Sequence, residues 1–406
     1  MAPPEHSHHS PLPLAGYLDA CATSPPSAGV VRVMAEVQQE AWANPSSLHG
    51  FGLRAAESLE RSRQRLAELL GAHHHELTFC SGATEAIHLA LLGVAAAMPP
   101  GRLVISAVEH PATAAAAARL GERGWQVVVL PVDRQGVIDL DALRAMLSPP
   151  TRLVSLIWGQ SEVGTLQPIA EAAALCRAAA IPLHVDAVQV LGHQVIHLAE
   201  LPIDLLSGTA HKLQGPRGVG LLVRRRELAI RPLIGGPQEG GLRGGTESVV
   251  LAAGFVQAME EASERLAAHA GLDPLADWRD SLLSELLALP GVALSGAPAQ
   301  PGKRLPHHIS LLVSSQAGQP LSGRGLVREL WRHGLAVSSG SACSSVVRAG
   351  AQQGSGVLRA MGFGEAEAAS GVRISLGPWL RREDLARIPA LFDQARRELV
   401  AFRGGL

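Results

Sequence analysis

The sequence predicts an α/β fold, in which a mostly parallel sheet of seven strands carries helices on both faces and a smaller α+β unit follows. Short apolar runs alternate with Ala- and Leu-rich helical patterns through about the first 250 residues, which is typical of a parallel sheet. The chain has 406 residues, of which 47% are hydrophobic and 17% charged, so it can bury a large core. This length suggests two or three structural units.

Seven apolar runs are the candidate strands of the sheet. They are Leu77–Cys80, Leu103–Ser106, Gln126–Leu130, Leu153–Trp158, Pro182–Val185, Leu205–Ser207 and Gly218–Val223. Helical patterns separate several of these runs, at Thr84–Ala97, Ala112–Arg123, Leu140–Leu147 and Ile169–Ala180. An amphipathic helix over about Leu53–Leu70 precedes the first strand.

A second unit follows a long helical pattern that runs from about Ser248 to Ala268. We place the boundary inside this helix, so that residues 18–255 form a large unit and residues 1–17 and 256–406 form a small one. The helices expected in the small unit are Pro274–Leu289, Gly323–His333 and Arg382–Leu399. Its expected strands are His308–Val313, Ala336–Ser338 and Val372–Ser375.

The composition excludes several classes of function. The formal net charge is −1 and aromatic residues make up only 3% of the chain, so neither a nucleic-acid surface nor a membrane patch is expected. The cysteines, Cys21, Cys80, Cys176 and Cys343, have no metal-ligand spacing, and no metal site is predicted. The N-terminal residues lack the apolar run of a signal peptide, and a cytoplasmic protein is expected.

Lysine is rare in this chain. Lys212 and Lys303 are its only two lysines, although Lys and Arg together number 35. A composition this biased toward arginine would replace a lysine that is needed only for its charge. The guanidinium of arginine stays protonated, whereas a lysine amine can lose its proton and attack a carbonyl. Lys303 lies in a Pro-rich stretch and is expected to be an ordinary solvated side chain. Lys212 is therefore the first candidate for covalent chemistry.

Two predicted strands end in residues suited to ligand binding. The segment Phe79-Cys-Ser-Gly-Ala-Thr-Glu85 leads from a strand into a helix, so Ala83 and Thr84 would offer helix N-terminal N–H groups to a phosphate. A plain strand–helix turn is the alternative for this segment. Asp186 lies at the end of another strand, where an open α/β sheet places ligand contacts. The alternative for Asp186 is that it only caps the next helix.

Together, Asp186 and Lys212 and their neighbours have the spacing that pyridoxal phosphate needs. Asp186 would keep the pyridine nitrogen protonated, and Gln189 would bond the ring hydroxyl. Lys212 would form the covalent link to the cofactor, while Thr209 and His211 would reach its phosphate. The combination is much more specific than any one of these residues.

Motifs along nearly the whole chain resemble those of one family. They lie at Tyr17–Pro25 (YLDACATSP), Asn44–His49 (NPSSLH), Ser81–Glu85 (SGATE), Glu109-His110, Leu242–Thr246 (LRGGT), Val337–Ser345 (VSSGSACSS) and Arg373–Gly377 (RISLG). The chain resembles the class V aminotransferase family and, within it, the group I cysteine desulfurases of the NifS/IscS kind. The resemblance implies the aspartate-aminotransferase-like fold type I of pyridoxal-phosphate enzymes, with the cofactor in the large unit.

The resemblance also implies roles for individual residues. His110 stacks on the cofactor ring and assists proton transfer, and Asn44 belongs to the substrate-binding set. Thr246 reaches across the interface of a homodimer to the partner's phosphate. Arg373 binds the substrate carboxylate, and a bidentate pair of this kind gives orientation as well as affinity.

The segment around Cys343 indicates the reaction. Small residues without periodicity predict a loop over about 336–356, and the Ser and Gly residues beside Cys343 cannot supply the apolar pocket of a core cysteine. A small buried core residue is the better interpretation of Cys21, Cys80 and Cys176. The resemblance implies that Cys343 is the nucleophile of a desulfurase.

One position departs from the family pattern. The family usually carries Asn before Glu in N-E-x-G, near the cofactor ring and the substrate carboxylate. This chain has Gln160-Ser-Glu-Val-Gly164, which places Ser161 there. Serine is shorter and offers fewer hydrogen bonds, and Gln160 beside it is a candidate substitute.

These observations predict a cysteine desulfurase that converts L-cysteine to L-alanine and leaves a persulfide on Cys343. Lys212 would remove the α-proton of the substrate. The persulfide would pass to an acceptor protein, an iron–sulfur scaffold or a sulfur carrier, as in cluster assembly or tRNA thiolation. The alternatives are another pyridoxal-phosphate enzyme of the same family (a selenocysteine lyase, cysteine lyase or transaminase) and a sulfur carrier or scaffold without turnover.

Overall fold

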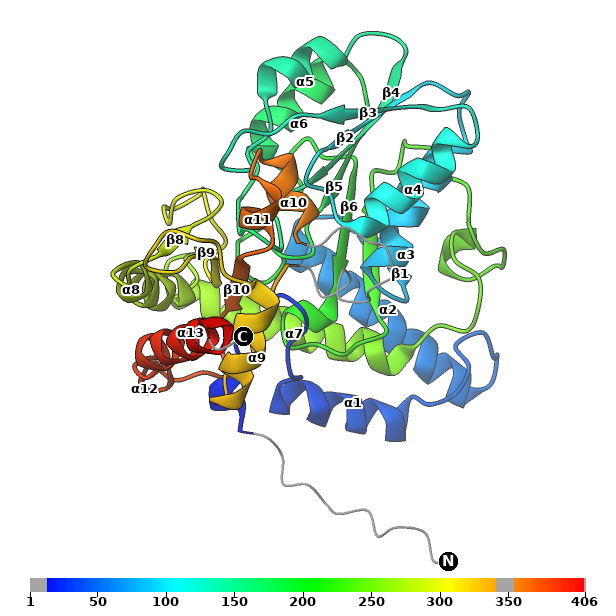
Figure 1. Ribbon diagram of the computed structural model, residues 1–406. Helices are drawn as coiled ribbons and strands as arrows, with labels where there is room; N and C mark the ends of the chain where they lie inside the picture. The colour runs from blue at the N-terminus through cyan, green and yellow to red at the C-terminus, as the bar shows by residue number, and fades with distance from the viewer. Residues whose placement is uncertain (1–12, 341–353, 405–406) are drawn as a thin grey trace, which may run out of the picture.

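The computed structural model describes residues 13–340 and 354–404, which form a large and a small unit (Figure 1). The large unit is built on a sheet with the strand order β1-β7-β6-β5-β4-β2-β3. Its strands are β1 (Leu77–Cys80), β2 (Arg102–Ser106), β3 (Gln126–Leu130), β4 (Thr151–Ile157), β5 (Leu183–Asp186), β6 (Leu205–Thr209) and β7 (Gly220–Arg224). Strand β7 is antiparallel to its neighbours β1 and β6, and the other neighbouring pairs of this sheet are parallel. The predicted seven-stranded, mostly parallel sheet is confirmed.

The sheet buries side chains on both faces because successive residues of a strand point to opposite sides. In β2, Leu103 and Ile105 pack under α3 (Ala83–His88) and α4 (Pro111–Gly121), whereas Val104 packs into the core on the other face. Five helices close that second core. They are α1 (Ala28–Glu40), α2 (Gly50–Leu70), α5 (Leu140–Met146), α6 (Ile169–Ala178) and α7 (Val249–Ala267).

Two helices of the large unit differ from the prediction. The helix expected over 84–97 begins at Ala83 and changes to a π-helical turn over Leu89–Gly93, where the carbonyl of Gly93 accepts a hydrogen bond from the backbone N–H of Arg231 at 3.0 Å. Helix α1 was not predicted. It begins after Ser27, whose hydroxyl accepts a hydrogen bond from the backbone N–H of Val30 at 3.0 Å and so caps the first turn.

The small unit packs helices on an antiparallel sheet with the strand order β10-β9-β8. Its strands are β8 (Val292–Leu294), β9 (His308–Val313) and β10 (Gly371–Ser375). Its helices are α8 (Leu275–Leu287), α9 (Gly323–Arg332), α10 (Gly356–Ala360), α11 (Glu365–Ala368), α12 (Arg382–Leu385) and α13 (Ile388–Gly404).

Two predictions for the small unit were wrong in detail. The helix expected over 382–399 is divided into α12 and α13, because Pro389 has no N–H to donate to the carbonyl four residues earlier. The strand expected over 336–338 forms only isolated bridges, between Ala336 and Tyr17 and between Ser338 and Arg373. The predicted smaller α+β unit itself is confirmed.

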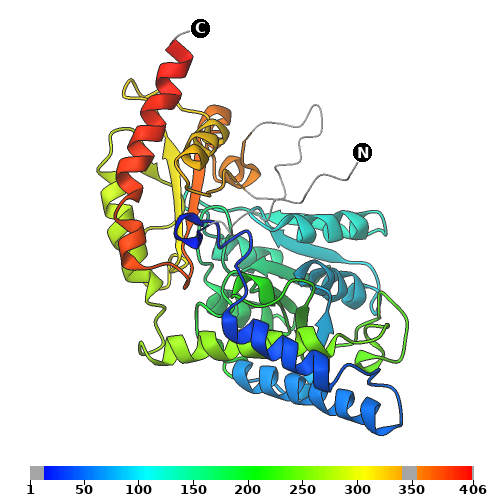
Figure 2. The same ribbon diagram turned by 90° about the horizontal axis from the view of Figure 1, so that it is seen from below.

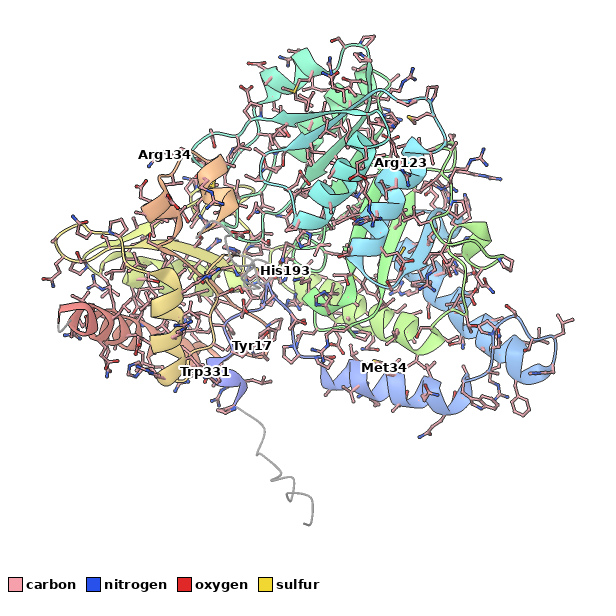
Figure 3. All side chains as sticks on the ribbon, turned by 45° about the vertical axis from the view of Figure 1, so that its right-hand side comes forward. Tyr17, Met34, Arg123, Arg134, His193 and Trp331 are labelled. Carbon is pink, nitrogen blue, oxygen red and sulfur yellow. The ribbon has the colours of Figure 1, made fainter. Side chains whose placement is uncertain are left out.

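The N-terminal segment joins the two units (Figure 2). Leu18 lies in the small-unit core, and Asp19 forms a bridge with Ser375 at the end of β10. Figure 3 shows His193 where the two units meet, and its ring stacks on that of His307 with a centroid distance of 3.8 Å. The domain boundary near residue 255 stays a prediction.

None of the helices within residues 13–340 and 354–404 is long and apolar enough to cross a membrane.

Candidate active site

A cavity of about 440 Å³ lies at the carboxyl edge of the large sheet, beside the small unit. His110 follows β2, Ser161 follows β4, Asp186 ends β5 and Lys212 follows β6, and the carboxyl ends of parallel strands meet at one edge. The predicted site residues that line this cavity are Ala83, Thr84, His110, Ser161, Asp186, Gln189, Thr209, His211, Lys212 and Arg373.

Lys212 ends a short 3-10 turn after β6 and extends its amine into the cavity. Its Nζ donates hydrogen bonds to the main-chain carbonyls of Cys21, at 2.6 Å, and Ala22, at 2.8 Å. The same carbonyl of Cys21 accepts a hydrogen bond from Nε2 of Gln189 at 3.0 Å. The N-terminal segment therefore orients both Lys212 and Gln189.

Asp186 is a buried carboxylate that lines the cavity. It is 3% exposed, and its Oδ1 accepts a hydrogen bond from the backbone N–H of Val188 at 3.0 Å. Burial raises the pKa of Asp186, while the nearby His110 and Lys212 oppose this shift. A cationic hydrogen-bond donor against this carboxylate would offset its desolvation, and the protonated nitrogen of a pyridine ring is such a donor.

His110 caps helix α4 with its ring. The backbone N–H of Ala112 donates to Nδ1 at 3.1 Å, so the neutral ring carries its proton on Nε2. Burial lowers the pKa of His110, which keeps the ring neutral at pH 7. The ring is therefore suited to pack against an aromatic cofactor without adding a positive charge.

Further residues that line the cavity provide polar backbone and side-chain groups. Ala83 and Thr84 form the first turn of α3, which has no side-chain cap. The hydroxyl of Thr209 donates to the carbonyl of Val219 at 2.9 Å, and Nδ1 of His211 lies 3.1 Å from the hydroxyl of Thr23. Burial lowers the pKa of His211 to about 4, so this ring is neutral at pH 7.

Arg373 brings a buried positive charge from β10 of the small unit. Its NH2 lies 2.6 Å from Oδ1 of Asp19, and its NH1 donates to the main-chain carbonyl of Ser161 at 3.0 Å. Gln160, the candidate substitute for the family Asn, is 2% exposed and does not line the cavity. Its side-chain amide donates to the carbonyl of Val108 at 3.2 Å and accepts from the N–H of Val163 at 3.0 Å.

Sequence reasoning missed the residues that act through their main chain or as ion-pair partners. Cys21 and Ala22 provide the carbonyls that hold Lys212, and Asp19 pairs with Arg373. Arg217, which follows Lys212 in the chain, also lines the cavity. The motif Tyr17–Pro25 could have indicated that the N-terminal segment contributes to the site. A sequence motif does not show, however, which main-chain carbonyls face the site.

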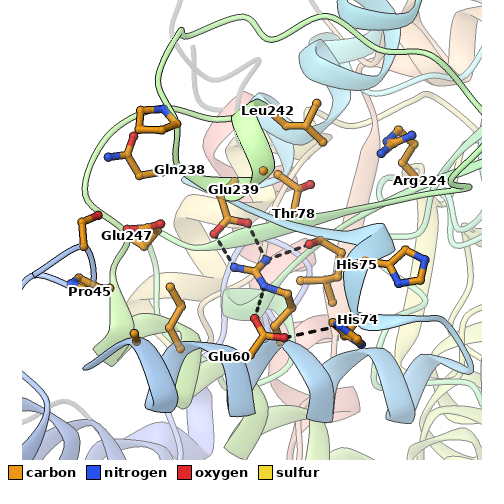
Figure 4. Close-up of a pocket in the computed structure, with 17 residues that line it drawn as sticks. Pro45, Glu60, His74, His75, Thr78, Arg224, Gln238, Glu239, Leu242 and Glu247 are labelled. Atoms are coloured by element: carbon orange, nitrogen blue, oxygen red, sulfur yellow. Dashed lines mark hydrogen bonds and ion pairs between the residues drawn. The ribbon is translucent and has the colours of Figure 1, made fainter. Parts of the chain in front are cut away.

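Two predicted residues lie away from this cavity. Asn44 and Thr246 are exposed and do not line it. They flank a second, larger hollow of about 690 Å³ between α2 and the loop over 235–247, where Pro45 and Glu247 are among the lining residues (Figure 4). Cys343 lies outside the described residues.

The residues of the first cavity fit pyridoxal phosphate. A buried carboxylate, a lysine amine and a neutral imidazole face the same space as the uncapped first turn of α3. With the mostly parallel sheet, they define a pyridoxal-phosphate enzyme of fold type I. The predicted fold class and cofactor are in agreement with this arrangement.

The chain belongs to the class-V aminotransferase family, whose sequence model matches residues 16–388. It is 36% identical over 373 residues to the cysteine desulfurase IscS of Dictyoglomus turgidum, a match that covers 91% of each chain. It is 37% identical to the cysteine desulfurase NifS of Azotobacter vinelandii, over 92% of this chain and 90% of that one. A solved NifS-like protein, 31% identical, superposes with a TM-score of 0.83 and covers 95% of this chain and 99% of that one.

These similarities confirm the predicted family, fold and cofactor. The individual roles of the site residues stay predictions.

Proposed function

We propose that the chain is a pyridoxal-phosphate-dependent cysteine desulfurase, which converts L-cysteine to L-alanine and leaves a persulfide on Cys343. One observation carries the proposal: Lys212, Asp186 and Arg373 line the same cavity although they come from distant parts of the sequence. An amine for the cofactor and a buried guanidinium for a substrate carboxylate are thereby brought together. The names of the relatives support the same reaction.

Pyridoxal phosphate supplies an electron sink for the electrons released at the substrate α-carbon. Asp186 would keep the ring nitrogen protonated, Gln189 would bond the ring hydroxyl and His110 would pack against the ring. Lys212 would provide the covalent link. Ala83, Thr84, Thr209 and His211 would bind the phosphate, and their positions around the cavity support this assignment.

Arg373 holds the substrate carboxylate, with Ser161 beside it. Once the substrate amino group has displaced Lys212 from its covalent link, the freed amine is the base for the α-proton. It lies in the cavity against the Cys21 carbonyl, which can accept a hydrogen bond from the ammonium that forms. His110 assists from Nε2, the nitrogen that does not accept the hydrogen bond from Ala112.

Cys343 is the proposed sulfur acceptor, on the strength of the sequence around it. Its thiolate attacks the substrate sulfur, so a sulfur–sulfur bond forms and the sulfur–carbon bond breaks. The electron pair of the broken bond stays on the β-carbon, which takes up a proton, and the fragment leaves as L-alanine. The transfer of the persulfide to an acceptor protein and a cytoplasmic location stay predictions.

The predicted homodimer is also part of the proposal. Three apolar side chains near Asn44 are strongly exposed: Leu48 by 91%, Trp42 by 61% and Phe51 by 60%. The hollow in Figure 4 joins this segment to the loop that carries Thr246. A second copy of the chain on this face would cover the apolar side chains and bring Thr246 towards the partner's site.

The reaction is tested with purified, cofactor-loaded protein, L-cysteine and an excess of a thiol reductant, which releases the persulfide sulfur as sulfide, by measuring alanine and sulfide together. Equal amounts of both are expected. The Cys343→Ala variant should keep the cofactor spectrum and lose sulfide release, whereas Cys176→Ala, which changes a buried core cysteine, should keep both. Sulfide release unchanged in Cys343→Ala would contradict its role. A keto acid in place of alanine would favour the transaminase alternative.

The dimer is tested by Leu48→Asp, which places a charge at the most exposed of these side chains. Wild-type protein should elute as a dimer in size-exclusion chromatography and the variant as a monomer. Trp331→Asp is the matched control, because Trp331 is 53% exposed but lies on α9 of the small unit. A monomeric wild-type protein would contradict the proposal.

A further inference from the structure

Arg373, the proposed carboxylate-binding residue, already has a carboxylate partner in this chain. Its side chain is 2% exposed, and its NH2 lies 2.6 Å from Oδ1 of Asp19. The main-chain carbonyl of Ser161 accepts from NH1 at 3.0 Å. Asp19, whose side chain is 19% exposed, comes from the N-terminal segment, 354 residues away in the sequence.

The guanidinium of Arg373 keeps donors for a further ligand. It presents five N–H groups in a planar fork, and Nε is buried without a hydrogen-bond partner among the described residues. Because Nε is buried, a ligand carboxylate would meet NH1 and NH2, which each bear two N–H groups and make one hydrogen bond each, to Ser161 and Asp19. The pKa of Arg373 is raised although burial lowers it, because Cys21, Asp19 and Glu162 act in the opposite direction. Arg373 therefore stays charged when a ligand enters.

We propose that the carboxylate of Asp19 competes with the substrate carboxylate for Arg373, and that this competition sets the affinity of the site for amino acids. This inference rests on the proposed function, in which Arg373 binds the substrate. Two carboxylates on one buried guanidinium repel each other. A substrate that forms a bidentate pair with Arg373 must therefore displace Asp19 from NH2 or share the guanidinium with it at a cost in affinity.

The structure allows Asp19 to leave without a movement of the chain. Its main chain is held by the bridge to Ser375, and its carbonyl accepts a hydrogen bond from the hydroxyl of Tyr17 at 3.4 Å. The carboxylate itself is partly exposed, so it can turn towards solvent while the backbone stays in place. The competition therefore involves one side chain, and its strength depends on the charge of Asp19.

The test is the Asp19→Asn variant of the cofactor-loaded protein. Asn keeps the size and the acceptor oxygen but removes the charge. We expect the KM for L-cysteine to fall about tenfold, equivalent to about 1.4 kcal/mol, with a smaller change in kcat. We also expect L-alanine, which carries the carboxylate without the sulfur, to raise the melting temperature of Asp19→Asn more than that of the wild-type protein, because tighter binding stabilises the folded state more.

Asp393→Asn is the matched control. Asp393 pairs with Arg396 at 2.7 Å, and the two side chains are 23% and 5% exposed, close to the values for Asp19 and Arg373. This pair lies on α13, away from the cavity. The control variant should lose stability without alanine, yet its KM and its response to alanine should equal those of the wild-type protein.

An increase of KM in Asp19→Asn, with a weaker response to alanine, would overturn the proposal, since Asp19 would then orient Arg373 for the substrate. An effect of equal size in Asp393→Asn would also overturn it. A different result would show that the proposed function itself is wrong in assigning the substrate carboxylate to Arg373. In that case Arg373→Gln would leave both the KM and the response to alanine unchanged, whatever the result with Asp19→Asn.

Discussion

Lys212 and Cys21 are joined by a hydrogen bond of 2.6 Å between the lysine amine and the main-chain carbonyl of the cysteine. The carbonyl is positioned by the small unit, because the N–H of Cys21 donates to the hydroxyl of Ser375 at 2.9 Å and its Sγ lies 3.3 Å from Nε2 of His307. The position of the proposed cofactor lysine therefore depends on the contact between the two units.

The first prediction concerns the two lysines. The Lys212→Arg variant keeps the charge that bonds to Cys21 but cannot form a covalent link to the cofactor, so the visible absorbance of the lysine-bound cofactor should disappear. Lys303→Arg is the control, because Lys303 is exposed and lies outside the cavity. Borohydride reduction followed by mass spectrometry should place the cofactor on Lys212 in the wild-type protein. A cofactor attached to Lys303 would contradict the assignment.

The second prediction concerns the ion pair between Arg63 and Glu239 (Figure 4). NH1 of Arg63 lies 2.7 Å from Oε2 of Glu239, and the Glu239 side chain is only 1% exposed. The same oxygen accepts from the backbone N–H of Phe79 at 2.7 Å. Glu239→Gln removes the buried charge partner of Arg63 and leaves it only the half-exposed Glu60, 3.2 Å from its Nε. We expect a loss of about 3 kcal/mol in the free energy of unfolding, measured with urea.

An exposed pair provides the control for Glu239. Arg65 and Glu260 are also 2.7 Å apart, but their side chains are 46% and 32% exposed. Glu260→Gln should change the free energy of unfolding by less than about 1 kcal/mol, because solvent screens this pair. Equal losses in the two variants would show that burial does not strengthen the Glu239 pair.

Local sequence patterns predicted the sheet and many of the residues that line the cavity. Asp186 and Lys212, for example, were recognised from the few residues on either side of them, at the ends of predicted strands. The pairing of Asp19 with Arg373 has no such signal, because it depends on how the N-terminal segment crosses to β10. The sequence also suggested Gln160 as a substitute for the family Asn, because it does not show the hydrogen bonds of the Gln160 amide. In the structure this amide bonds to the backbone of Val108 and Val163.

The third prediction is a pH dependence of stability from His184. This buried ring lies between two hydroxyls, with Nδ1 2.8 Å from that of Ser155 and Nε2 3.1 Å from that of Ser207. Burial lowers its pKa from 6.5 to about 3. Between these values the unfolded chain binds a proton that the folded protein does not. The stabilising contribution is therefore complete above pH 6.5 and is lost as the pH falls towards 3.

The measurement for His184 is the free energy of unfolding between pH 4 and 6 in urea. In this window His184→Asn should reduce the pH slope by about 1.4 kcal/mol per pH unit, the value for one proton. His74→Asn is the control, because the His74 side chain is 53% exposed, and its slope should match that of the wild-type protein. An unchanged slope in His184→Asn would mean that the folded protein also protonates this ring.

The last prediction concerns Gly220, at the start of β7 behind the proposed phosphate site. A Cβ at this position would lie 2.5 Å from the carbonyl carbon of Gly82 and 2.8 Å from the carbonyl oxygen of Gly208. Both neighbours are backbone atoms, so Gly220→Ala must displace the loop that leads into α3. We expect weaker binding of pyridoxal phosphate, by about tenfold or more, measured by equilibrium dialysis of the apo-protein.

The control is Gly121→Ala. A Cβ at position 121 would meet no atom within 4 Å, so this variant should bind the cofactor like the wild-type protein. Wild-type affinity in Gly220→Ala would show that the loop before Ala83 does not hold the phosphate.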